Sequence, residues 1–118
     1  MSYIQGFLIA VPKANKDVYI ELARASAVLF KEYGAISIVE AWSESNKDGK
    51  VTDFKRAVLA QEDEAIVFSW IEWPDKATCD AAAARMESDT RWRDLPEMPF
   101  DGKRMIWGGF EPIFRMDA

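Results

Sequence analysis

The chain has 118 residues, of which 49% are hydrophobic, enough to form the core of one domain without a disulfide or a metal. Its 15 basic and 20 acidic residues give a net charge of -5, which argues against nucleic acid as the main partner because phosphate binding needs a basic surface. One cysteine and no histidine exclude an intrachain disulfide, a Ser-His-Asp mechanism and His-ligated metals.

The first part of the chain predicts a strand, a helix and a second strand. Residues 3–11 are rich in β-branched, aromatic and aliphatic residues and are followed by Pro12, which predicts a strand. Asn15 is a suitable N-cap for an amphipathic helix of about five turns. The residues that recur at helical spacing are Val18, Leu22, Ser26, Leu29 and Tyr33. Gly34 stands where a glycine ends a helix, and residues 35–42 predict the second strand.

The middle of the chain predicts a loop, a third strand and a second main helix. Residues 43–52 are polar and predict a loop, and residues 53–58 predict a short helical turn capped by Thr52. An acidic turn at 61–64 precedes a strand at 65–73, which Pro74 ends. Asp75 can cap a helix that continues to about Glu87, and residues 91–93 predict a separate short turn.

The last part of the chain predicts an irregular connection and a fourth strand. Residues 96–102 contain two prolines, and residues 104–114 predict a strand in which Gly108 and Gly109 indicate a bulge or a tight bend. The element order β-α-β-β-α-β predicts an α+β, ferredoxin-like fold in a single domain, 1–118. We expect a four-stranded antiparallel sheet with two helices on one face.

The predicted strands are apolar on both faces, although two helices can cover only one face of a sheet. In the first strand, Phe7 and Ile9 point to one side, and Ile4 and Leu8 point to the other. A large exposed apolar face usually marks an interface, so we expect a homodimer that joins two copies through this sheet face. The alternative is a monomer whose own loops cover the face.

Two carboxylates fall at apolar-patterned strand positions and are candidates for proton transfer. Glu40 shares a face with Ile38, and Glu72 shares a face with Phe68. A desolvated carboxylate has a raised pKa and can act as a general acid or base. The alternative is that each is paired with a cation such as Lys55, Arg56 or Arg104, or that it lies in water at a strand end.

Three tryptophans and a basic pair are candidates for ligand binding. Trp42, Trp70 and Trp107 would suit an aromatic ligand if they line a flat apolar pocket, and the alternative is core and dimer packing. Arg56 can hold an anionic group, and the alternative is a local ion pair with Asp53 or Glu62. Cys79 has no partner histidine and is expected to fill space, and no ligand spacing indicates a metal or a cofactor.

The sequence gives no targeting signal for export. The first residues include no basic stretch and no cleavage site, which argues against a signal peptide. The apolar run at 7–11 is far shorter than the ~20 residues that span a bilayer. We therefore expect a cytoplasmic protein without a membrane or nucleic-acid partner.

Four stretches of the chain resemble the uncharacterised bacterial YbaA-like family. They are FLIAVPKANK at 7–16, GKVTDFKRAV at 49–58, VFSWIEWP at 67–74 and MPFDGKRMIWGGF at 98–110. The stretches are long and are spread over nearly the whole chain. The resemblance implies a dimeric α+β barrel, but it implies no activity and no catalytic residues, because the family is defined by sequence and fold alone.

Two functions follow as hypotheses from these features. The first is a small cytoplasmic homodimer that binds a small apolar or aromatic molecule. The alternative is a cofactor-independent enzyme of the dimeric α+β barrel type, monooxygenase- or isomerase-like, in which a buried carboxylate moves a proton; this rests on analogy of fold. A third possibility is an interaction protein without a ligand. The candidate ligand-binding or proton-transfer residues are Glu40, Trp42, Arg56, Trp70, Glu72 and Trp107.

Overall fold

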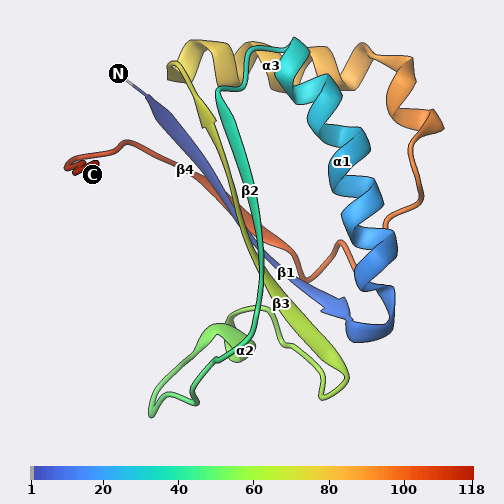
Figure 1. The fold of residues 1–118 in the computed structure, drawn as a ribbon, viewed down its shortest axis with the longest axis vertical. Helices are drawn as coiled ribbons and strands as arrows, with labels where there is room; N and C mark the ends of the chain where they lie inside the picture. The colour runs from blue at the N-terminus through green and yellow to red at the C-terminus, as the bar shows by residue number, and fades with distance from the viewer. Residues whose placement is uncertain (1) are drawn as a thin grey trace.

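A four-stranded antiparallel sheet forms the centre of the computed structural model, which describes residues 2–118 (Figure 1). Its strands are β1 (Tyr3–Pro12), β2 (Ser37–Trp42), β3 (Glu64–Trp73) and β4 (Ile106–Phe110), in the spatial order β2-β3-β1-β4. The helices are α1 (Lys16–Glu32), α2 (Phe54–Ala57) and α3 (Lys76–Ser88), with short 3₁₀ segments η1 (Lys13–Asn15) and η2 (Thr90–Asp94). The predicted antiparallel sheet and its two main helices are confirmed.

The two main helices lie on the same side of the sheet (Figure 1). We call this side the helix face and the opposite side the open face. The strand register places Phe7 and Ile9 of β1 on the helix face, and Ile4 and Leu8 on the open face, as the alternating pattern predicts. Within residues 2–118, no helix combines the length and the hydropathy that crossing a membrane requires.

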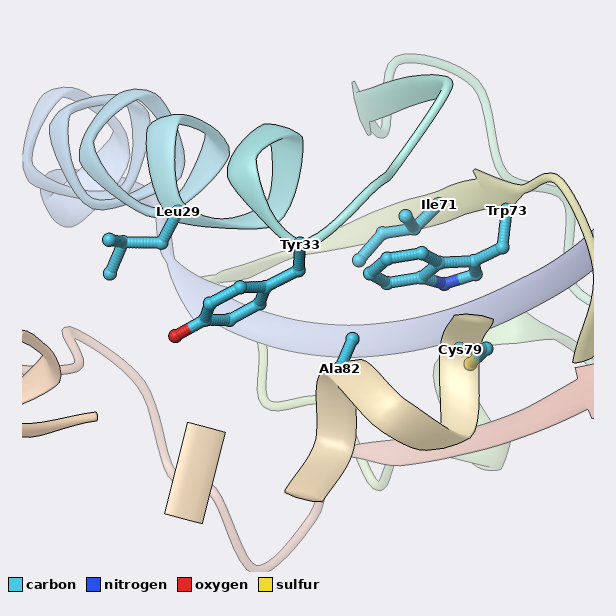
Figure 2. Packing of buried hydrophobic residues seen from close by; sticks show 6 residues of the cluster. All are labelled: Leu29, Tyr33, Ile71, Trp73, Cys79 and Ala82. Carbon is cyan, nitrogen blue, oxygen red and sulfur yellow. The ribbon is translucent and has the colours of Figure 1, made fainter. Parts of the chain in front are cut away.

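The core lies between the helix face and the helices. Figure 2 shows Tyr33, the residue that follows α1, and Trp73 of β3 packed above α3. Cys79 and Ala82 are the α3 side chains that meet them, and their small size allows the helix to approach the sheet closely. Cys79 is buried, and the prediction that it fills space is confirmed.

A cluster of apolar side chains, smaller than the one beneath the helices, covers one end of the open face. Val58, which follows α2, packs on Ala10 and Ile66, and all three side chains are buried. Farther along the same face, Phe68 and Phe110 remain exposed. The chain's own loop therefore covers only part of the second apolar face.

The ends of the helices match the prediction at Asp75 and Gly34 and differ from it at Asn15 and Thr52. Asp75 caps α3 by accepting a hydrogen bond from Thr78 N, as predicted. The side chain of Asn15 does not cap α1, and its Nδ2 instead donates to Pro99 O at 2.9 Å. The cap of α2 is Asp53, whose carboxylate accepts from Arg56 N, and not Thr52.

The fourth strand is shorter than predicted and contains no bulge. It covers Ile106–Phe110, and its pairing with β1 is continuous through Gly108 and Gly109. A Cβ atom at Gly109 would lie 1.7 Å from the hydroxyl oxygen of Tyr3, so this glycine leaves room for the Tyr3 ring. The glycine pair therefore reflects close packing and not a break in the strand.

Gly34 ends α1 with a Schellman motif. Its φ is +111°, Gly34 N donates to Lys31 O, and Ala35 N donates to Phe30 O. A side chain at this φ is strained, and a Cβ atom here would also lie 2.9 Å from the Thr78 methyl group.

We expect Gly34→Ala to lower the free energy of unfolding by about 1–2 kcal/mol, because an L-residue is disfavoured in the left-handed region. Urea unfolding followed by circular dichroism measures the change. Gly102→Ala is the matched control, because its Cβ would meet only the Met98 methyl group, at 3.4 Å, and its φ is not in that region. Equal losses of stability in Gly34→Ala and Gly102→Ala would contradict the assignment of a left-handed conformation to Gly34.

Candidate functional site

A cavity of about 380 Å³ lies between α1, the helix face and the chain that follows α3. Residues from the sheet form its floor, including Phe7, Ile9 and Ile71, and Phe30 of α1 lines another side. Most of its lining residues are apolar. The polar ones are Tyr19, Ser26, Glu40 and Ser69. Its volume lies in the range of small-molecule sites, which are mostly apolar with a few placed polar groups.

The polar end of the cavity is a hydrogen-bonded pair. Tyr19 of α1 donates its hydroxyl to Glu40 Oε1 of β2 at 2.6 Å, and Ser69, directly opposite Glu40 in the β2–β3 register, also hydrogen-bonds to the carboxylate. Burial raises the pKa of Glu40, and the two hydrogen bonds offset part of that rise. Burial and the charge of Glu40 raise the pKa of Tyr19, which therefore keeps its proton at neutral pH.

Glu40 lies on an edge strand, so one side of the residue is open to water. The Tyr19–Glu40 pair also borders a second hollow of about 250 Å³, which Lys16 and Trp42 line. The Lys16 ammonium lies 5.4 Å from the centre of the Trp42 ring, a cation–π distance. None of the ion pairs within residues 2–118 includes Glu40, so a hydroxyl, and not the predicted cation, is its partner.

The wall opposite the sheet is an irregular segment, residues 95–105, which we call the strap. Leu95, Met98 and Phe100 of the strap line the cavity. The strap is held at its centre by the hydrogen bond from Asn15 to Pro99 O, and the ring of Phe100 packs on that of Tyr19 at 5.9 Å. The sequence analysis assigned no role to this segment.

A buried ion pair fixes the end of the strap. Arg104 donates to both carboxylate oxygens of Glu64 at 2.7 Å, and the Glu64 side chain is only 4% exposed. The same guanidinium also donates to Asp101 and to Leu59 O. The hydrogen bonds from Arg104 are the main cause that lowers the pKa of Glu64. Arg104 is thus fully engaged within the fold and does not face Glu40, Glu72 or the cavity.

The six candidate residues do not form one site. Glu40 lines the cavity, and Trp42 lies beside it in the neighbouring hollow. Arg56 pairs locally with Asp53, at 3.6 Å, as its alternative interpretation predicts. The expectation that the three tryptophans line one pocket is wrong, because the register places Trp70 on the open face while Trp42 and Trp107 lie on opposite edge strands.

Glu72 and Trp70 belong to the open face. Glu72 accepts a hydrogen bond from Arg115 Nη1 at 2.7 Å, so its partner is a cation, although not one of the three predicted. Trp70 packs edge-on against Phe68, with ring centres 5.5 Å apart.

Tyr19 and Ser69 are the functional candidates that the sequence analysis missed. Tyr19 lies next to the apolar stripe of its helix, and Ser69 is a lone hydroxyl within the apolar run of β3. Neither residue type is unusual at its position in the sequence, so neither stands out as a functional candidate. Their meaning depends on the register that places Ser69 opposite Glu40.

We expect Arg104→Met to destabilise the fold at neutral pH, because it leaves the Glu64 carboxylate buried without a partner. The pKa of Glu64 is lowered in the folded protein, so the ion pair stabilises above about pH 4.5 and its contribution is lost as the pH falls through the folded pKa. The difference in free energy of unfolding between wild type and variant should therefore shrink between about pH 7 and pH 3.

Urea unfolding at several pH values measures this difference. Arg24→Met is the control, because Arg24 pairs with Glu21 on the exposed surface of α1, where an ion pair contributes little. A loss of stability in Arg104→Met that is the same at every pH would show that packing, and not charge, is responsible.

Comparison with known proteins identifies the relatives of the chain. A family model described as "Protein of unknown function (DUF1428)" matches residues 2–102. The chain is 57% identical over 114 residues, 96% of this chain and 97% of the relative, to the uncharacterized protein YbaA of Escherichia coli (strain K12). The same values hold for YbaA of Escherichia coli O157:H7 and of Shigella flexneri. These matches confirm the resemblance to the YbaA-like family, and the chain belongs to the DUF1428 family of proteins of unknown function.

Proposed function

We propose that the protein binds a small, largely apolar molecule in the cavity between α1, the helix face and the strap. The observation that carries this proposal is a cavity of about 380 Å³ whose apolar walls end in one hydrogen-bonded polar group. Such a combination gives affinity through the apolar surface and orientation through the polar group. Of the six candidate residues, Glu40 is the one placed to contact such a ligand.

The lining defines the chemistry of the ligand. Phe30, Trp92 and Phe100 favour a flat or aromatic body, and the methionine side chains of the cavity adapt to its shape. Glu40 accepts a hydrogen bond from Tyr19 and keeps further lone pairs, so it favours a ligand that carries a hydroxyl or an amine as donor. An anionic ligand would meet the negative charge of Glu40 and is disfavoured.

The second part of the proposal is a homodimer formed through the open face. The strand order β2-β3-β1-β4, with every neighbouring pair antiparallel, supports the ferredoxin-like arrangement on which a dimeric α+β barrel is built. Phe68, Ile106 and Phe110 are exposed together on the open face, and a second copy would cover them. A buried, unpaired thiol at Cys79 suits the reducing cytoplasm.

A second candidate function is cofactor-independent proton transfer in the same cavity. The observation that favours it is the raised pKa of Glu40 beside the Tyr19 hydroxyl, at 2.6 Å. Glu40 would take a proton from the bound molecule, and Tyr19 would hydrogen-bond to the charge that develops. Proton NMR of the small molecule before and after incubation with the protein separates the two functions, because a proton transfer changes the spectrum even though it leaves the mass unchanged, and because only an enzyme loses this conversion in Glu40→Gln.

We expect 1-aminoanthracene, an apolar aromatic amine whose fluorescence rises in apolar surroundings, to bind saturably to the wild-type protein. Ser26→Leu should weaken binding roughly tenfold or more, because it places a larger side chain in the cavity. Glu40→Gln should weaken it by up to roughly tenfold, because the charged acceptor is lost. Fluorescence titration measures both changes, and circular dichroism checks that the variants fold.

Glu21→Gln is the matched control, because Glu21 lies on the exposed surface of α1 away from the cavity. As the pH is lowered, protonation of Glu40 removes the charged acceptor, and wild-type affinity should fall. Because the pKa of Glu40 is raised, this fall should begin at a pH above the ordinary range of a carboxyl group, and Glu40→Gln should abolish it. Binding that is unchanged in Ser26→Leu would overturn the location of the site.

For the homodimer, native mass spectrometry should show a species of twice the chain mass of 13.4 kDa. The same spectrum reports any small molecule that is retained. A species of one chain mass at every concentration would exclude the dimer while leaving the cavity proposal intact.

A further inference from the structure

The end of the chain carries bulky apolar side chains that contact almost nothing in their own subunit. Residues 111–118, which we call the arm, leave the sheet at Phe110 and form neither helix nor strand (Figure 1). Ile113, Phe114 and Met116 of the arm are 96%, 84% and 78% exposed. Three such side chains in one short segment form an apolar surface that a monomer leaves in water.

The arm is nevertheless fixed to the open face. Arg115, which lies between the apolar side chains, donates to Glu72 Oε2 at 2.7 Å. In the register, Phe110 is opposite Ile4 and Ile4 is opposite Glu72, so the arm crosses the end of the sheet from β4 towards β3. The arm is therefore part of the surface that a second copy would meet on the open face.

The open face also offers a hollow of matching chemistry. It has a volume of about 320 Å³ and lies at Gly6 and Gly108, which are paired on β1 and β4 and leave space because they have no side chains. Phe54, Phe68 and Ile106 are among its apolar walls. The arm of the same chain does not fill it, since the apolar arm side chains are exposed.

We infer that the arm of each subunit packs its apolar side chains on the open face of the second copy, with the hollow at Gly6 and Gly108 as the receiving site. This inference rests on the proposed homodimer and names the residues that hold it. A single chain carries both the arm and the hollow on the same face, so a two-fold contact satisfies both at once and closes the assembly. Any other partner would need an apolar surface of its own. It would cover either the arm or the hollow and leave the other exposed to water.

The dimer dissociation constant, measured by sedimentation velocity over a dilution series, tests the inference. Phe114→Ser removes an apolar side chain of the arm and should weaken the dimer roughly tenfold. Gly108→Val fills the hollow and should weaken it by a similar amount. The fold has room for this change, because a Cβ atom at Gly108 would lie 3.7 Å from the Phe110 ring. Val28→Ser, at an exposed position of α1, is the control and should change the constant by less than about twofold.

A covalent trap gives a second measurement that does not depend on affinity. The double variant Gly108→Cys, Phe114→Cys should form a disulfide between two chains under mild oxidation, which appears as a band of twice the mass on a non-reducing gel. Each single variant is a control. The native thiol of Cys79 is buried, and burial raises its pKa, so it does not compete. A disulfide within one chain would overturn the inference, since it would place the arm in its own hollow.

The outcomes separate the inference from the proposed function. A monomeric wild type would overturn both the dimer and the arm contact. A dimeric wild type whose dissociation constant is unchanged in Phe114→Ser and Gly108→Val would overturn the arm contact alone. Binding of 1-aminoanthracene reports on the cavity at Tyr19 and Glu40, which lies on the other face, and should be the same in all of these variants.

Discussion

Apolar side chains on both faces of the two central strands are the constraint on which the rest of the structure depends. The chain has two main helices, and both lie on one side of the sheet. That side becomes the core, and the space left between α1 and the sheet becomes the cavity at Tyr19 and Glu40. The other side is covered near Val58, and Phe68, Ile106 and Phe110 remain exposed on it. Core, cavity and proposed dimer surface are thus three results of one alternating pattern in β1 and β3.

Two glutamates, Glu40 and Glu64, differ in what satisfies their charge. Glu64 is held by a guanidinium through two hydrogen bonds, and its pKa is lowered, so it serves the fold. Glu40 receives neutral hydroxyl donors, and its pKa is raised by burial. A carboxylate with this second environment keeps a free hydrogen-bonding capacity at the edge of an apolar wall. For this reason Glu40, and not Glu64, is the centre of the proposed site.

Local patterns predicted most of the fold. The strand at residues 3–11 is one residue shorter than β1, and Asp75 and Gly34 mark the ends of α3 and α1 as predicted. The cap of α2 was placed one residue too early, at Thr52, and two other errors arose where distant segments meet. The amide of Asn15 bonds to Pro99, 84 residues away, and Gly109 is required by the ring of Tyr3. Neither partner can be found from spacing along one element.

The candidate site was predictable only in part for the same reason. Glu40 stands out as a carboxylate in an apolar strand, but its partner Tyr19 belongs to another element, 21 residues earlier. The partner of Glu72 lies 43 residues later, in the arm. The tryptophans attract attention by their number, although their pairing register separates them. Sequence reasoning therefore identifies unusual residues and cannot assign their neighbours.

The strap gives the protein a way to change its cavity without changing its sheet. Side chains at 95–105 form one wall of the cavity, but the segment takes no part in strand pairing and is held through a few contacts near its centre and end. Substitutions at positions such as Met98 would alter the size and shape of the cavity and leave the register of all four strands intact. Under the proposed function, members of one family can in this way share a backbone and select different molecules, with the variation confined to a segment of eleven residues whose two anchors, Asn15 and Glu64, lie outside it.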